Sequence, residues 1–272
     1  MVLLLGGMQG DVREEPLPLR EVRSPAESPE GDAPGTRFIY GGRGYRPVDA
    51  LRAVWTKMRW SKALLVMFGL TLFWVVSLFA APLSIPPREF SFTEGGANVV
   101  DHWDIYAKPS FNWFAKVIYT VGDAQCHQLW YRSLWINENQ FPIDARMTSL
   151  YIFGAFGLFW AMMTAPAASA SQGIANAFPP WIRRWAEKIG IEKFALLIVF
   201  LGLLPIGVDG FTQLFSAVTH YESTNPIRIL TGVPGGLVAG LLLGMMVKAI
   251  KQFDVEYRLV RAKSSMTAPN KE

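Results

Sequence analysis

The chain has few of the residues that most often form disulfides or soft-metal sites: one cysteine and three histidines among 272 residues. A single cysteine excludes a disulfide within the chain. Neither a CxxC nor an HxxxH spacing occurs, so the metal signal is weak. Charged residues are also scarce, at 18%, whereas 51% of the residues are hydrophobic. This balance is more apolar than that of an average soluble domain.

Four long apolar runs account for this composition. They cover residues 63–85, 148–170, 194–218 and 229–247. A helix needs about 20 apolar residues to cross a hydrocarbon core of about 30 Å. The expected fold class is therefore all-α, a polytopic membrane helix bundle with four transmembrane helices. Apolar side chains also recur at helical spacing within residues 109–123, which predicts an interfacial helix on the outer side.

The positions of lysine and arginine predict the topology. Twenty of the 26 lie before the first run, between the second and third runs, or after the fourth. Cations that flank a span are retained on the cytoplasmic side. Both termini are therefore expected in the cytoplasm, with the chain in a prokaryotic cell (inner) membrane. The net charge of +4 is explained by contact with anionic lipid of the bilayer and requires no nucleic acid.

The predicted organisation has five parts. They are a cytoplasmic, largely disordered tail (1–50), a first transmembrane helix (51–85), an outer segment containing the interfacial helix (86–125), a membrane domain with three transmembrane helices (126–250) and a cytoplasmic C-terminal tail (251–272). The tail prediction depends on residues 11–45, which are rich in Pro, Glu, Arg, Gly and Ser and have too few apolar side chains to offset the entropy of ordering.

Polar residues inside or beside the spans carry the functional signal. Asp209 lies well inside the third run, where a carboxylate costs several kcal/mol unless it is paired or neutralised. Gln213 follows one helical turn later, on the same face. Under the predicted topology, other polar residues converge on the same outer end. The candidate polar cluster consists of Cys126, His127, Gln128, Arg132, Asp144, Arg146, Asp209, Gln213, His220, Glu222, Asn225 and Arg228.

Each part of this pattern also has a structural interpretation. Asp209 can be the buried partner of Arg146 or Arg228 and so fix the helix register. Residues 222–225 precede a proline and have the composition of a turn and helix cap. Gly236, Gly240 and Gly244 form two consecutive GxxxG steps, which predict close helix packing.

Several short motifs, taken together, resemble a family of small multi-pass prokaryotic membrane proteins of unknown function. The motifs are CHQ followed by RS, then PxxAR, DGxxQ and ESTNxxRxxTG, and the resemblance covers about residues 112–250. Beyond the residues already named, it involves Ser133, Pro142, Ala145, Gly210, Ser223, Thr231 and Gly232. The family's PxxAR element usually reads PxCARC, which implies a soft-metal ligand set.

This chain departs from the family at that element. Asp144 and Met147 occupy the two cysteine positions, which argues against a cysteine-rich zinc site. Cys126, His127 and Asp144 remain as candidate ligands for a harder metal. The first apolar run and the N-terminal tail lie outside the resemblance. The resemblance carries neither an activity nor a cofactor.

Two functional hypotheses follow. The first is a non-catalytic accessory or structural subunit of a larger membrane complex, in contact with other membrane-protein subunits. The alternative is a membrane enzyme or binding protein for an anionic headgroup or lipid-linked substrate. In that case, the anion clamps are Arg132, Arg146 and Arg228. The general base is Asp209 or Glu222, and the proton shuttle is His127 or His220. Complete pairing of the charges favours the first hypothesis, and an open pocket lined by unpaired charges favours the second.

Overall fold

The computed structural model describes residues 38–40, 43–45, 47–96, 98–215 and 221–267. The chain divides into two units, Met1–Arg46 and Pro47–Glu272. In the first unit, strand β1 (Phe38–Tyr40) pairs antiparallel with strand β2 (Arg43–Tyr45). Most of the predicted N-terminal tail and the last five residues lie outside the described residues.

The second unit is mainly helical, as predicted. Its helices are α1 (Pro47–Arg59), α2 (Lys62–Leu83), α3 (Trp103–Tyr106), α4 (Trp113–Asp123), α5 (Ala145–Met163), α6 (Ala170–Asn176), α7 (Pro180–Ile189), α8 (Ile191–Leu214) and α10 (Asn225–Thr267), with a 3-10 turn at Trp130–Arg132. Three helices are long and apolar enough to cross a membrane, namely α2, α8 and α10 as far as Lys263. The expectation of four spans is thus confirmed for three helices only.

Helix α5 corresponds to the second predicted span, residues 148–170, and does not reach the same apolarity. Its first turns carry Arg146, Thr148 and Ser149, and these polar side chains lower the mean hydropathy of the helix. It nevertheless has 19 residues. At a rise of about 1.5 Å per residue, it is about 28 Å long, close to the thickness of a hydrocarbon core.

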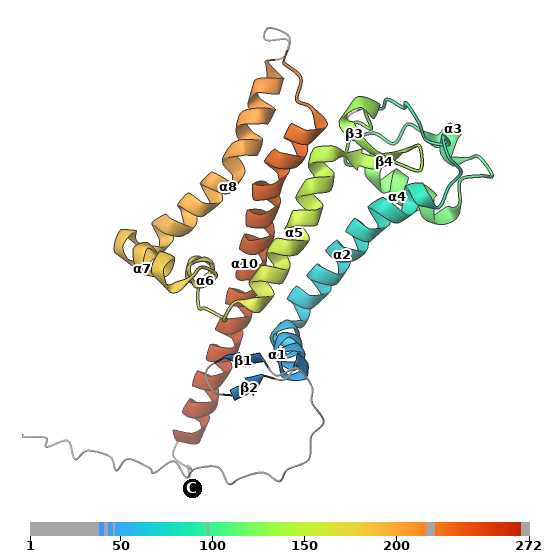
Figure 1. Cartoon of the computed structure of the whole chain (residues 1–272). Helices are drawn as coiled ribbons and strands as arrows, with labels where there is room; N and C mark the ends of the chain where they lie inside the picture. The colour runs from blue at the N-terminus through green and yellow to red at the C-terminus, as the bar shows by residue number, and fades with distance from the viewer. Residues whose placement is uncertain (1–37, 41–42, 46, 97, 216–220, 268–272) are drawn as a thin grey trace, which may run out of the picture. The chain divides into compact units, whose positions relative to one another are not determined.

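The long helices alternate in direction (Figure 1). Helices α5 and α10 run parallel to each other. The Ser149 hydroxyl of α5 donates to the Ile229 carbonyl near the start of α10, and the Lys248 ammonium far along α10 donates to the Ala161 carbonyl near the end of α5. Helices α2 and α8 run the opposite way on either side of this pair. For α2, Trp74 contacts Tyr151 of α5 at a ring distance of 6.0 Å.

Small residues bring α5 and α10 into backbone contact. A Cβ atom on Gly240 would lie 2.1 Å from the Gly154 carbonyl oxygen, and one on Gly236 would lie 2.6 Å from the Leu150 carbonyl oxygen. On the other helix, a Cβ atom on Gly157 would lie 2.3 Å from the Leu237 carbonyl oxygen. No side chain larger than hydrogen fits at these positions without moving a helix. Such close approach lets dispersion contacts and weak polar contacts between backbones hold membrane helices together.

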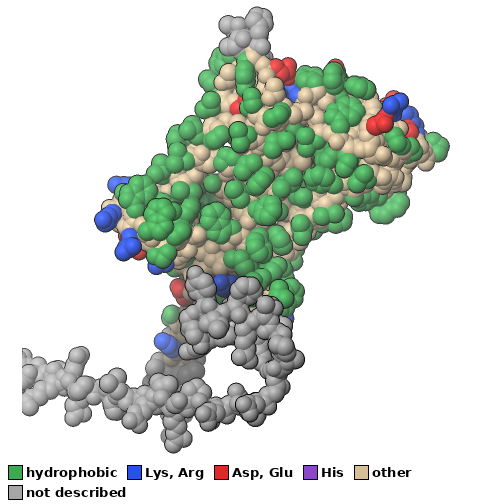
Figure 2. Space-filling view, in the orientation of Figure 1, with side chains coloured by type: hydrophobic (Ala, Val, Ile, Leu, Met, Phe, Trp, Pro, Cys, Tyr) green, Lys and Arg blue, Asp and Glu red, His purple; other side chains and the backbone are tan. Residues whose placement is uncertain are grey.

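The face seen in Figure 2 is dominated by hydrophobic side chains along the long helices, with charged groups near the ends. Leu70 and Phe73 of α2, and Leu196, Phe200 and Phe211 of α8, are exposed. A soluble protein rarely exposes so continuous an apolar surface. The same surface is expected of helices whose outward faces contact lipid.

A compact cap follows α2 in the chain and precedes α5. It contains α3, α4 and a hairpin of β3 (Ser133–Ile136) and β4 (Asn139–Asp144). The hairpin corrects the all-α expectation. Asn137 and Glu138 both adopt positive φ, at 52° and 55°, and connect Ile136 to Asn139 in a two-residue turn. Two consecutive residues with positive φ are the signature of a type I′ turn, which matches the twist of paired strands.

Candidate functional site

Asp209 is the centre of a polar cluster at the end of the bundle where α5 and α10 begin and α8 ends. Its side chain forms an ion pair with Arg146 at the start of α5. Its two carboxylate oxygens also accept hydrogen bonds from the Tyr221 hydroxyl, at 2.8 Å, and the Ser223 hydroxyl, at 3.0 Å. Asp209 is only 5% exposed. Three donors from two other parts of the chain therefore satisfy a carboxylate placed on a membrane helix.

Glu222 is a second centre within the same cluster. One of its oxygens accepts from Arg132 Nε at 3.0 Å and lies 2.9 Å from Arg132 Nη2. The same oxygen is 3.8 Å from Arg228 Nη2. The Glu222 side chain is 50% exposed, so solvent screens these pairs more than it screens the Asp209 pair.

Gln213 and Arg228 connect the two centres. With its amide oxygen turned toward the two guanidinium groups, Gln213 accepts from Arg228 at 2.7 Å and from Arg132 at 3.0 Å. Arg228 Nε also donates to the Ser223 carbonyl at 2.9 Å. Arg228 is 2% exposed, and Glu222 is its oppositely charged partner. We call this set the Asp209 cluster. It consists of Arg132, Arg146, Asp209, Gln213, Tyr221, Glu222, Ser223 and Arg228.

The structure does not bring Cys126, His127 or Gln128 into the cluster. Cys126 is buried among apolar side chains that include Phe141 and Ile143. The His127 side chain is exposed, and its backbone carbonyl accepts from the Gly95 amide. Gln128 donates to the Pro142 carbonyl in the cap. Adjacent side chains project in different directions. Of the CHQ motif, Cys126 therefore lies in an apolar core, His127 lies at the surface and Gln128 binds a backbone carbonyl.

Asp144 and Asn225 flank the cluster in structural roles. Asp144 is the N-cap of α5, where it accepts from the Met147 amide at 2.6 Å. Asn225 at the start of α10 donates to the Ser133 carbonyl at 3.0 Å and so attaches α10 to β3. His220, also predicted in the cluster, lies outside the described residues.

The candidate metal ligands of the CHQ motif do not form a ligand set. Burial, with a smaller contribution from the negative charge of Asp144, raises the pKa of the Cys126 thiol. The His127 side chain is at the surface, and the one group of potential ligand atoms that lie together among the described residues does not include Cys126, His127 or Asp144.

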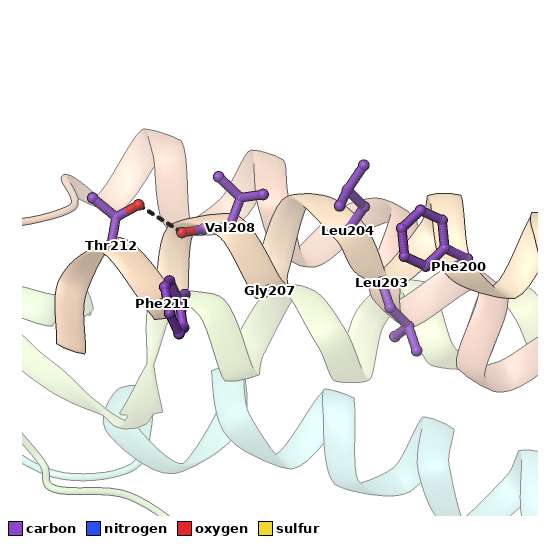
Figure 3. Close-up of a pocket in the computed structure, with 7 residues that line it drawn as sticks. All are labelled: Phe200, Leu203, Leu204, Gly207, Val208, Phe211 and Thr212. Atoms are coloured by element: carbon purple, nitrogen blue, oxygen red, sulfur yellow. Dashed lines mark hydrogen bonds between the residues drawn. The ribbon is translucent and has the colours of Figure 1, made fainter. Parts of the chain in front are cut away.

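A groove of about 440 Å³ lies elsewhere, along one side of α8 (Figure 3). Every labelled residue belongs to this helix, and all but Thr212 are apolar or glycine. The Thr212 hydroxyl donates to the Val208 carbonyl of its own helix at 2.8 Å and offers little to a ligand. None of the groove-lining residues belongs to the Asp209 cluster. The groove has the character of a lipid-facing helix surface.

Two polar groupings were not singled out from the sequence. Tyr221 is a direct partner of Asp209, although it stands within the predicted loop as one aromatic among many. In the cap, His102 lies between Asp101 and Asp123. His102 and Asp123 are 21 positions apart, and no local spacing links them. The one available signal was the sequence Asp101-His102, where a scarce histidine follows a carboxylate.

Part of the chain is similar to a known protein family. Residues 126–242 match the model of a family described as "Predicted membrane protein (DUF2085)". Comparison with curated proteins and with solved structures found no significant match. The matched part contains α5, α8 and the Asp209 cluster, and excludes α2, α3 and α4. The resemblance inferred from the sequence is confirmed at the level of a membrane protein family of unknown function, whereas its individual motifs stay predictions. Residues 126–242 are thus similar to a predicted membrane protein family, and with its three long apolar helices the chain is an integral membrane protein.

Proposed function

We propose that this chain is a non-catalytic accessory subunit of a larger membrane complex, in which the Asp209 cluster fixes the ends of three membrane helices. One observation carries the proposal. Each of the five charged side chains in the cluster has an oppositely charged partner within 4 Å. A catalytic or anion-binding site needs charged groups left open to a ligand, whereas here they are engaged with one another.

The supporting topology has four spans and both termini in the cytoplasm. Helix α2 ends beside the cap, whereas α8 begins at the opposite end of the bundle. If both helices cross the membrane, the chain between them has to cross as well, and α5 is the helix available for it. This arrangement puts Arg183, Arg184 and Lys188 on the cytoplasmic side, in agreement with the distribution of cations.

Cysteine accessibility tests this topology. In a Cys126→Ser background, Glu138→Cys lies in the exposed β3–β4 turn and Glu187→Cys lies on the exposed face of α7. A membrane-impermeant maleimide added to intact cells or spheroplasts is expected to label position 138 and to leave position 187 unlabelled until the membrane is opened. Labelling of both positions in sealed membranes would contradict the four-span arrangement.

The proposed contact with other subunits is supported by aromatic side chains on the cap. Phe92, Trp103 and Trp113 are all exposed, by 60% or more of their surface. Rigid aromatic side chains dominate protein interfaces and also membrane interfaces. Purification from native membranes in a mild detergent, followed by mass spectrometry, distinguishes a protein interface from a membrane interface. Stoichiometric partner proteins that are lost on Trp103→Ala/Trp113→Ala support the subunit, whereas a chain that purifies alone from every gentle detergent contradicts it.

The alternative, recognition of an anionic headgroup, is favoured by one observation. Arg146 Nε is buried and has no hydrogen-bond partner among the described residues, although the same guanidinium group pairs with Asp209. That donor is available to a phosphate or carboxylate oxygen. Lipid mass spectrometry of the same preparation tests it. A stoichiometric anionic lipid that disappears in Arg146→Gln would replace the structural interpretation of the cluster.

A further inference from the structure

The cap has an apolar core that encloses two polar side chains. Phe90, Tyr106, Phe111 and Tyr119 belong to this core. Among them, Asp123 at the end of α4 is completely buried, and His102 just before α3 is 6% exposed. A buried carboxylate and a buried imidazole cost free energy unless each is paired. Neither residue belongs to the Asp209 cluster or to the part of the chain that matches the membrane protein family.

Three carboxylate oxygens surround one nitrogen of His102. Its Nδ1 lies 3.0 Å and 3.1 Å from the two oxygens of Asp123, and 3.1 Å from Oδ1 of Asp101. A ring nitrogen carries at most one hydrogen, so it can donate fully to only one of these oxygens. The two carboxylates together carry more negative charge than one imidazolium can balance. The group therefore carries negative charge that a bound cation would offset.

Each carboxylate also accepts a hydrogen bond at Oδ2 from a separate donor. The Gly96 amide donates to Asp101 Oδ2 at 2.7 Å, and the Tyr106 hydroxyl donates to Asp123 Oδ2 at 2.7 Å. These bonds hold both carboxylates beside His102 Nδ1. Outer-shell donors of this kind orient the ligands of metal ions and fix their geometry.

A second observation comes from the other ring nitrogen. His102 Nε2 is buried and has no hydrogen-bond partner among the described residues. Buried side-chain polar atoms in proteins are nearly always paired, so a purely structural imidazole would be expected to use both nitrogens. The ring instead pairs through Nδ1, which faces the carboxylates, and it packs edge to face with the Phe90 ring at a centroid distance of 5.3 Å. A ligand on Nδ1 explains why this orientation is kept.

The close approach of a glycine loop completes the site. A Cβ atom on Gly95 would lie 2.8 Å from His102 Cε1 and 2.9 Å from Asp101 Oδ1. The loop thus packs directly against the cluster, and Gly95 is tied in place by the bond from its amide to the His127 carbonyl. Asp101 is the exposed member of the group, with a side chain 38% accessible, and provides the route from solvent.

We propose that Asp101, His102 and Asp123 form a binding site for a divalent transition-metal ion, with Zn²⁺ as the probe of choice. Their potential ligand atoms all lie within 4.8 Å of one another. One imidazole nitrogen and two carboxylate oxygens suit zinc, which binds such atoms at about 2.0–2.2 Å and leaves neighbouring donors roughly 3 Å apart. Calcium and magnesium favour sites built from oxygen alone. Binding would link the loop of Gly95 and Gly96 to α4 and so fasten the cap.

Metal titration of the purified full chain tests this site. After treatment with a chelator, isothermal titration and elemental analysis are expected to find about one Zn²⁺ per chain, as a three-ligand site predicts. Asp101→Asn and His102→Gln are each expected to weaken binding by at least about tenfold, because each removes a ligand. His127→Gln is the matched control, since it removes an exposed histidine outside the site.

Thermal unfolding without metal identifies variants that simply fail to fold. If His102→Gln unfolds, Asp101→Asn still decides the question, because Asp101 is partly exposed and outside the apolar core. Absence of stoichiometric Zn²⁺ binding, or binding with the same affinity in Asp101→Asn as in His127→Gln, would overturn the proposal. The site and the Asp209 cluster share no residue, so failure of one leaves the other standing.

Discussion

Replacing Asp209 with asparagine tests whether the Asp209 cluster stabilises the bundle. Asparagine keeps the size of the side chain but removes the charge opposite Arg146, whose side chain is only 17% exposed. Removing one partner of a buried ion pair costs about 3–5 kcal/mol, because the other charge is left without compensation. The amide can still accept one of the hydroxyl hydrogen bonds from Tyr221 and Ser223, so the lower part of this range is expected. The free energy of unfolding is measured by SDS titration in mixed micelles.

The matched control is Glu222→Gln in the same cluster. The Glu222 side chain is half exposed, and exposed ion pairs contribute about 0.2–1 kcal/mol. The expected ratio of the two effects is therefore at least about threefold. The double variant Arg146→Gln/Asp209→Asn should be less destabilised than the sum of its single variants, since the unpaired charge is gone. Equal costs for Asp209→Asn and Glu222→Gln would refute the argument that burial of the Asp209 pair fixes the helix ends.

Two further predictions concern the contact between α5 and α10. Gly240→Ala is expected to destabilise the bundle by about 1–3 kcal/mol, because the new Cβ would stand 2.1 Å from a backbone oxygen of α5. The control is Gly207→Ala, where a Cβ atom would have nothing within 4 Å. It should be neutral or slightly stabilising in the same SDS titration. Lys248→Met should cost about 2 kcal/mol, because the buried ammonium donates to the Ala161 and Thr164 carbonyls at the end of α5. The exposed Arg258→Met, which breaks only a pair within its own helix, serves as its control and should change thermal stability by less than about 0.5 kcal/mol.

The long apolar helices could be predicted because their signal is local. A run of about 20 apolar residues is sufficient to predict a helix in lipid, and α2, α8 and α10 follow that pattern. The β3–β4 hairpin could not be predicted in the same way. Its turn uses Asn137 and Glu138, and glutamate is an unusual residue for positive φ.

Some residues of the candidate site could be predicted from the sequence, and others could not. Asp209 and Arg146 stand out because charge is expensive in an apolar segment, and the structure pairs them. Cys126 and His127 were included because the predicted topology places them at the same outer end, but this topology does not give the direction of each side chain. One side chain is buried among apolar neighbours, and the other is exposed. The His102–Asp123 pair depends on how α4 folds back over the loop before α3, and only a three-dimensional structure contains that information.

The parallel pair of α5 and α10 is fastened by different chemistry along its length. At one end, the Ser149 hydroxyl donates to the Ile229 carbonyl beside the Asp209 cluster. In the middle, Gly154 and Gly240 approach too closely for any larger residue. At the other end, the Lys248 ammonium donates to the Ala161 and Thr164 carbonyls where α5 stops. We expect the charge at each end to fix how α5 and α10 align along their length, because glycine contacts recur at every turn and select no single alignment. The polar residues of the bundle thus determine which of several similar packings of smooth apolar helices is adopted.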